Sequence, residues 1–479
     1  MPSLSSLALV PVLLAGSLSA GEPEATKPWT MMVYGAADNN ADGPILHFLD
    51  RVRTALDDDP GMELILFIDR AEGFSEDARS LGSNFTGGRI YRLRKDSAEL
   101  LDASSHFPEL KAENDVEVDS ADPSNIGRFV TFCKERFPAE RYGLMIYSHA
   151  NGQTMCPDDR TDSNMAIPQL PDVVGAEASV DFLALELCYM GGIEIAYEWR
   201  PGNGGFSTDV LLAIPNAGAP LNWERAFARI RSQGHDTQAS GSVFDPKTLT
   251  AMDFGKLVIE EGHAGRRAYF DQVAREEPQF AQELIARNDS RLRESAGCYD
   301  LSKVTAVKAS VDRLAASLAL TNAKETFDSF RGTSQEARIM NYASNEDFRT
   351  HPYVDLYELL HMAAESEQLD GELREAAAVA RNNVDEFVVA SFGMREGFQD
   401  FKSGRNGVFV VFPDNGTWPQ LSWYTPLAGK TPSDPYGRWA FLADGATRDN
   451  GQVENWFELL DLWFDEDFES PGGSNGYDW

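Results

Sequence analysis

Basic residues are scarce in this chain of 479 residues. Asp and Glu total 76 against 42 Lys and Arg, so the formal net charge is −34 at pH 7. Proteins that bind nucleic acids through their phosphates need a basic surface, and this charge balance therefore argues against a nucleic-acid partner. It suits a protein in extracellular or salt-rich water, one that meets a cationic substrate or divalent cations.

Cysteines and long apolar runs are also few. Four cysteines are too few for a disulfide scaffold in a chain of this length. After the N-terminal stretch, no run approaches the ~18 apolar residues that cross a bilayer, so we expect no stable membrane insertion. The histidines show no metal-ligand spacing such as HExxH. Apolar residues still make up 42% of the chain, which supplies a core and excludes wholesale disorder.

The N-terminus has the composition of a secretory signal. An apolar stretch begins at Leu4 and ends on small residues before the polar segment 21–24. This pattern predicts cleavage near Ala20 and a secreted or periplasmic protein. No Lys or Arg precedes the stretch, and a buried N-terminal strand is the alternative interpretation.

Short apolar runs alternate with amphipathic stretches over the first half of the chain. Such runs, separated by helices, predict a parallel sheet covered on both faces, which is an α/β fold. The second half has helical periodicity, with one helix expected over 371–392 and a late strand over 406–413. The expected strands of the first half are 29–34, 64–68, 88–93, 143–147, 182–187 and 210–214.

Reactive side chains follow two of these strands. His149 comes after the run 143–147, and Cys188 after the run 182–187. If the strands are parallel neighbours, both side chains emerge at one sheet edge, where a thiol beside an imidazole forms a nucleophile with its base. Backbone amides of Cys188 and of the 150–152 loop are candidate donors to an oxyanion, and a helix expected directly after Cys188 would favour the thiolate. A strand-end cysteine is also a common small core residue, so the alternative stays open.

Around these residues the sequence resembles the clostripain family of cysteine peptidases, relatives of caspases, gingipains and legumains. The resemblance covers most of 28–465 and rests mainly on two blocks. It implies a caspase-like, mostly parallel sheet sandwiched by helices, with a C-terminal α+β extension. The specific blocks are DPSNIGRFVTFCKERFPAERYGLMIYSHANG (122–152) and VDFLALELCYMGGIEIAYEWR (180–200), supported by PWTMMVYGAADNN (28–40), YDLSKVTAVKASVDRLAASLA (299–319), YVDLYELL (353–360) and NGVFVVFP (406–413).

These patterns together predict a domain organisation. The leader is expected to be a signal peptide over 1–20, followed by a caspase-like catalytic domain over 21–235 and a C-terminal clostripain-family portion over 236–465. The acidic, Gly-rich residues 466–479 are expected to form a mobile tail.

Carried over by position, His149 is the catalytic base and Cys188 the nucleophile of an endopeptidase that cleaves proteins or peptides. The oxyanion hole would use the backbone amides of Ala150 and Cys188. Cleavage after a basic P1 residue is implied, with Glu186 and Asn216 as the S1 positions. Two departures bear on this. Ala150 replaces a glycine of the family, and Asn216 lies in a segment, 214–217, that replaces an acidic cluster.

Members of the family are often clipped between the catalytic His and Cys. Arg160 is the sole basic residue in that interval, within a polar, turn-rich segment. Self-processing at a basic residue would therefore follow Arg160, and an uncut surface loop is the alternative.

The chemistry itself requires no cofactor. The type member of the family uses calcium, and the aspartates at 57–59 and 158–159 are candidate Ca²⁺ ligands, although no EF-hand pattern is present. Two other function classes stay open from sequence: an inactive relative that binds peptides or surface partners, and a thiol amidase acting on small substrates.

Overall fold

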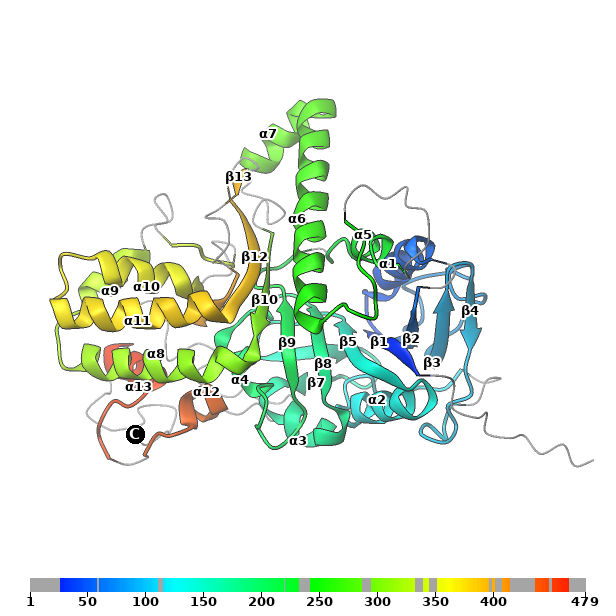
Figure 1. The fold of residues 1–479 in the computed structure, drawn as a ribbon, viewed down its shortest axis with the longest axis horizontal. Coiled ribbons are helices and arrows are strands. Elements are labelled where there is room, and N and C mark those ends of the chain that lie inside the picture. The colour runs from blue at the N-terminus through cyan, green and yellow to red at the C-terminus, as the bar shows by residue number, and fades with distance from the viewer. Residues whose placement is uncertain are drawn as a thin grey trace, which may run out of the picture.

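A ten-stranded sheet forms the centre of the molecule (Figure 1). The computed structural model describes residues 26–57, 60–110, 115–218, 220–231, 242–286, 294–331, 339–343, 351–395, 399–400, 407–413, 436–447 and 450–464. The predicted signal peptide, the acidic tail and position 235 lie outside these residues. Within them, no helix is both long and apolar enough to cross a bilayer.

The strand order is β13-β12-β10-β9-β8-β5-β1-β2-β3-β4. The inner strands β9, β8, β5, β1 and β2 pair in parallel, and the strands outside them pair antiparallel. The strands are β1 (Lys27–Ala37), β2 (Met62–Arg70), β3 (Gly87–Arg94), β4 (Ser97–Leu100), β5 (Ala139–Tyr147), β8 (Val180–Glu186), β9 (Thr208–Ala213), β10 (Ser295–Asp300), β12 (Val388–Arg395) and β13 (Gln399–Asp400).

The inner strands are continuous apolar runs because helices cover both faces of the sheet. Along β1, Met32 and Tyr34 contribute to one core, while Met31 and Val33 contribute to the other. This alternation is the two-residue period of a strand. The predicted α/β class is therefore confirmed, and each strand expected in the first half is present.

One face carries α1 (Asp42–Ala55), α5 (Trp223–Ala228) and the long α6 (Ala251–Glu276). The other carries α2 (Ser124–Arg136), α4 (Ile193–Glu198) and, beyond β12, the helices of the C-terminal extension (Figure 1). These are α8 (Val304–Ala319), α10 (Leu356–Glu365), α11 (Gly371–Phe387), α12 (Ala440–Ala443) and α13 (Trp456–Phe464), with a small sheet of β11 (Tyr353–Asp355) and β14 (Phe409–Val411).

Five further elements lie outside the central sheet and the helices named above. They are the strands β6 (Thr154–Asp158) and β7 (Ser163–Ala166), which pair as a hairpin, and the helices α3 (Leu170–Val174), α7 (Pro278–Ala286) and α9 (Lys324–Arg331). Strands β10 and β12 follow the predicted boundary at 235/236 and belong to the same sheet as β9.

One helix expected from sequence ends early. The helix predicted to run to 392 stops at Phe387, and Val388 begins β12. Adjacent β-branched residues at 388 and 389 favour a strand, and the pairing of β12 with β10 decides the matter.

Candidate active site

The register between β5 and β8 brings the two reactive residues together. Tyr147 pairs with Glu186 in this parallel ladder, and each strand ends at that pair. His149 and Cys188 each follow by two positions. Neighbouring strands lie about 4.8 Å apart, so both residues leave the sheet at the same edge.

His149 is held by a residue from the neighbouring strand end. Its Nε2 lies 2.5 Å from Oδ1 of Asn40, in the loop after β1. The amide oxygen accepts a proton, so Nε2 carries the hydrogen and Nδ1 carries the free lone pair. Desolvation lowers the pKa of His149 from its ordinary value of 6.5, against the opposing charge of Asp159. The imidazole is therefore neutral at neutral pH.

Cys188 is half-buried, while the other three cysteines are fully buried and all four are free thiols. Burial raises the pKa of the Cys188 thiol, and the N–H groups of Gly218 and of Cys188 itself act in the opposite direction. Donors that face a sulfur in this way stabilise its thiolate. Gly218 belongs to the loop after β9, the strand on the other side of β8.

The chain turns sharply after the thiol. Tyr189 adopts a left-handed backbone with φ of 59°, which is uncommon for a bulky residue. Its ring stacks on His351 at a centroid distance of 4.9 Å, and its N–H donates to the carbonyl of Asn216 at 3.2 Å. The expected helix begins only at Ile193, so the donors beside the sulfur come from loops and not from a helix end.

Ala150 has a negative φ, because the non-glycine residues of the described chain with a positive φ are Cys156, Asp162 and Tyr189. The Cβ that replaces the family's glycine at this position therefore costs no backbone strain. Its amide remains a candidate donor to an oxyanion.

Glu186 points away from solvent. Its carboxylate accepts from the backbone N–H of Leu221 at 3.0 Å and from Nε1 of Trp223 at 2.6 Å. Complete burial raises its pKa to about 7, and these hydrogen bonds and Arg266 oppose the rise. Asn216 is also buried, and its Oδ1 accepts from Ser295 N–H at 2.8 Å.

A narrow crevice lies beside Gly218, with no room for a water molecule. Glu294 and Arg266 line it and form an ion pair with each other. A Cβ built on Gly218 would lie 3.5 Å from Cγ of Glu294, which places this acid next to the backbone partner of Cys188. Glu294 is thus a second acidic group near Cys188.

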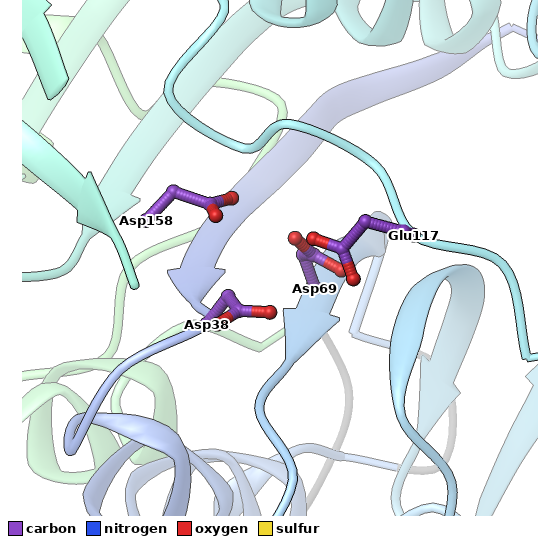
Figure 2. A group of neighbouring side chains, drawn as sticks. All are labelled: Asp38, Asp69, Glu117 and Asp158. Carbon is purple, nitrogen blue, oxygen red and sulfur yellow. The ribbon is translucent and has the colours of Figure 1, made fainter. Parts of the chain in front are cut away.

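Arg160 lies on the turn between β6 and β7. Its side chain is 46% exposed and pairs with Glu117. The turn is therefore on the surface, as the segment's composition predicts. Of the residues suggested for calcium, Asp57 lies 3.5 Å from Arg231, Asp58 and Asp59 fall outside the described residues, and Asp158 belongs to a buried group of acids (Figure 2).

Sequence reasoning missed Asn40, Gly218 and Glu294. Asn40 follows β1, so the strand-end rule that identified His149 and Cys188 also applies to it. Gly218 and Glu294 had no comparable signal, because their closeness to Cys188 depends on how the loop after β9 folds back.

Comparisons with known proteins agree with this architecture. A model of the clostripain family matches residues 33–456. Clostripain from Hathewaya histolytica is 30% identical over 492 aligned residues, covering 94% of this chain and 89% of that protein.

Two solved structures share the fold. An inactive zymogen C11 protease from Parabacteroides distasonis aligns over 83% of this chain and 95% of its own, with 14% identity and a TM-score of 0.51. A secreted C11 cysteine protease from Bacteroides thetaiotaomicron, in complex with an irreversible peptide inhibitor, aligns over 87% and 98%, with 16% identity and a TM-score of 0.52. The family match and the curated relative confirm the resemblance found in the sequence: this chain belongs to the clostripain family and is a cysteine peptidase.

Proposed function

We propose that this peptidase cleaves peptide bonds with Cys188 as nucleophile and His149 as general base and acid. The observation that carries the proposal is the β5–β8 register, which aligns the two strand ends. Both groups are neutral at pH 7, since the thiol pKa is raised and the imidazole pKa is lowered.

In this mechanism Nδ1 of His149 takes the thiol proton while Sγ attacks the scissile carbonyl carbon. The N–H groups of Cys188 and Ala150 donate to the oxyanion that forms, and Gly218 N–H stabilises the sulfur as it gains charge. The imidazolium then protonates the leaving amine and leaves an acyl-enzyme. Water, deprotonated by His149, attacks the thioester, and the carboxylic acid departs as the thiol is restored.

Covalent labelling separates this enzyme from an inactive, peptide-binding relative. A peptidyl acyloxymethyl ketone should add once per chain, and intact mass should show no adduct in Cys188→Ala. His149→Ala should label at least about a hundredfold more slowly, because a general base typically contributes that much. Cys133→Ala is the matched control, since Cys133 is buried in the core. A wild-type chain that takes no label, or a Cys188→Ala chain that does, contradicts the assignment.

Asn40 is proposed as a positioning residue for His149. Asn40→Ala should lower kcat/KM about tenfold, the value of one hydrogen bond of ~1.4 kcal/mol. His149 must be neutral to accept the thiol proton, so activity falls as pH falls through its pKa. That acidic limb should lie below pH 6.5 in the wild type. In Asn40→Ala this limb should move to a lower pH. The Asn40 oxygen accepts from Nε2–H and so stabilises the imidazolium, and its loss lowers the pKa of His149.

The pH profile of kcat/KM measures this directly. A role for Asn40 in folding alone would reduce activity at every pH and leave the limb in place. A wild-type limb above pH 6.5 would contradict the neutral imidazole.

A basic P1 preference is the second part of the proposal. Glu186 and Glu294 place two carboxylates near Cys188, and Arg266 offsets one of these charges. An arginine or lysine side chain that binds near Gly218 would pair with the remaining negative charge. Glu294 would thereby supply the negative charge that other members of the family carry in the segment matching 214–217.

Glu294→Gln should lower kcat/KM for a P1-Arg substrate about 10- to 100-fold, the range of a hydrogen bond to a charged group. The P1-norleucine substrate should change less than about twofold. Glu260→Gln is the control, since Glu260 is an exposed partner of Arg229. A peptide library with no basic P1 preference, or equal losses on both substrates, would refute this specificity and favour the amidase alternative.

We also propose that the chain is exported and then clipped after Arg160. Support comes from the apolar leader, the exposed β6–β7 turn and the basic side chain on it. Intact mass of mature wild-type protein should show a start near Gly21 and two fragments that divide after Arg160. Arg160→Ala and Cys188→Ala should each remain one chain, whereas Arg79→Ala should be cut normally. Cleavage of Arg160→Ala at the wild-type rate and position would contradict processing after Arg160.

A further inference from the structure

The C-terminal extension contacts both turns that carry the proposed reacting groups. Its small sheet of β11 and β14 lies against the turn 149–152, which follows β5, and against the turn 188–192, which follows β8. Tyr353 and Phe409 make these contacts, although 202 positions separate Tyr353 from Asn151. The extension therefore forms part of the surroundings of the candidate active site.

Tyr353 binds the turn that carries the histidine. Its side chain is fully buried, and its hydroxyl donates a hydrogen bond to the backbone carbonyl of Asn151. Gly152 makes this approach possible, since its φ is +91° and a Cβ on it would lie 2.4 Å from the Tyr353 oxygen. A left-handed position without space for a Cβ requires glycine. The sequence thus matches this contact on both sides.

Phe409 binds the turn that carries the thiol. Its N–H donates to the carbonyl of Gly191 at 2.9 Å, and a Cβ on Gly192 would lie 2.7 Å from its ring. The rings of Phe409 and Tyr353 stack with their centroids 4.2 Å apart. Tyr189, directly after the thiol, packs its ring on Tyr353 at a centroid distance of 5.3 Å. One group of aromatic rings therefore contacts both turns.

The turn 149–152 sets the direction of the Ala150 N–H. The residues on either side of Ala150 bond to β6, with Cys156 N–H donating to the His149 carbonyl at 2.9 Å and Asn151 N–H to the Thr154 carbonyl at 3.1 Å. Ala150 itself forms the non-hydrogen-bonded pair between these two bonds, so its N–H points out of the hairpin. A donor of this kind stabilises an oxyanion when its direction is fixed before the reaction.

We propose that Tyr353 is a positioning residue, whose hydroxyl fixes the turn that directs the Ala150 N–H at the oxyanion. The proposal rests on the roles proposed for His149 and Cys188. Tyr353 acts through the Asn151 carbonyl and touches none of the reacting atoms. Loss of its hydroxyl would free the turn to shift relative to Cys188. It would then weaken stabilisation of the oxyanion and leave the thiol and the imidazole as they are.

Tyr353→Phe tests this role, because it keeps the ring on Phe409 and removes only the hydroxyl. With a peptide anilide as substrate, kcat should fall about tenfold, the value of one hydrogen bond. KM should stay within about twofold, since the oxyanion forms in the transition state and is absent from the bound substrate. Iodoacetamide alkylates a thiol without forming an oxyanion, so the rate at which it modifies Cys188 should also stay within about twofold. The other three cysteines are fully buried, which makes Cys188 the reactive thiol of the folded chain.

Tyr34→Phe is the matched control. Tyr34 is also fully buried, and its hydroxyl donates to a backbone carbonyl, that of Ser120, at 2.9 Å. Each variant loses one buried hydrogen bond, so their Tm values should fall by similar amounts. Since Tyr34 contacts neither turn through its hydroxyl, its variant should keep kcat within about twofold of the wild type.

Three results would overturn the role of Tyr353. They are a kcat of Tyr353→Phe within twofold of the wild type, an alkylation rate that falls as far as kcat does, and an equal loss of kcat in Tyr34→Phe. Alkylation of the wild-type chain at a residue other than Cys188 would contradict the proposed nucleophile instead, so the failure of one proposal is distinguishable from the failure of the other.

Discussion

The parallel pairing of β5 with β8 is the constraint on which the site depends. Tyr147 opposite Glu186 sets the positions of His149 and Cys188, because each lies two residues further along its strand. A slip of one residue would turn the side chains of one strand to the opposite face. It would also move apolar side chains such as Leu144 and Leu183 out of the core in which they pack. The energy of the core therefore enforces the geometry of the site.

The neighbouring strands complete that edge of the sheet. Asn40, after β1, holds His149 from one side, and Gly218, after β9, faces Cys188 from the other. Four adjacent parallel strands, β1, β5, β8 and β9, thus contribute one residue each to the candidate site from the loops at their carboxyl ends.

Sequence predicted what depends on local pattern. The apolar runs identified the inner strands, and the residues directly after 143–147 and 182–187 identified His149 and Cys188. What depends on distant packing was less accessible. The run 371–392 reads as one helix, yet its last residues form β12 because β10 offers a partner. Glu294 approaches Gly218 although 76 positions separate them.

The account's central claim is that one sulfur and one imidazole act together at this edge. A crystal structure of the wild-type chain after reaction with a peptidyl acyloxymethyl ketone tests it most directly. We predict a bond from Cys188 Sγ to the inhibitor, Nδ1 of His149 facing that sulfur, and the inhibitor's carbonyl oxygen against the amides of Cys188 and Ala150. A bond to any other residue, or an imidazole turned away from the adduct, would contradict it.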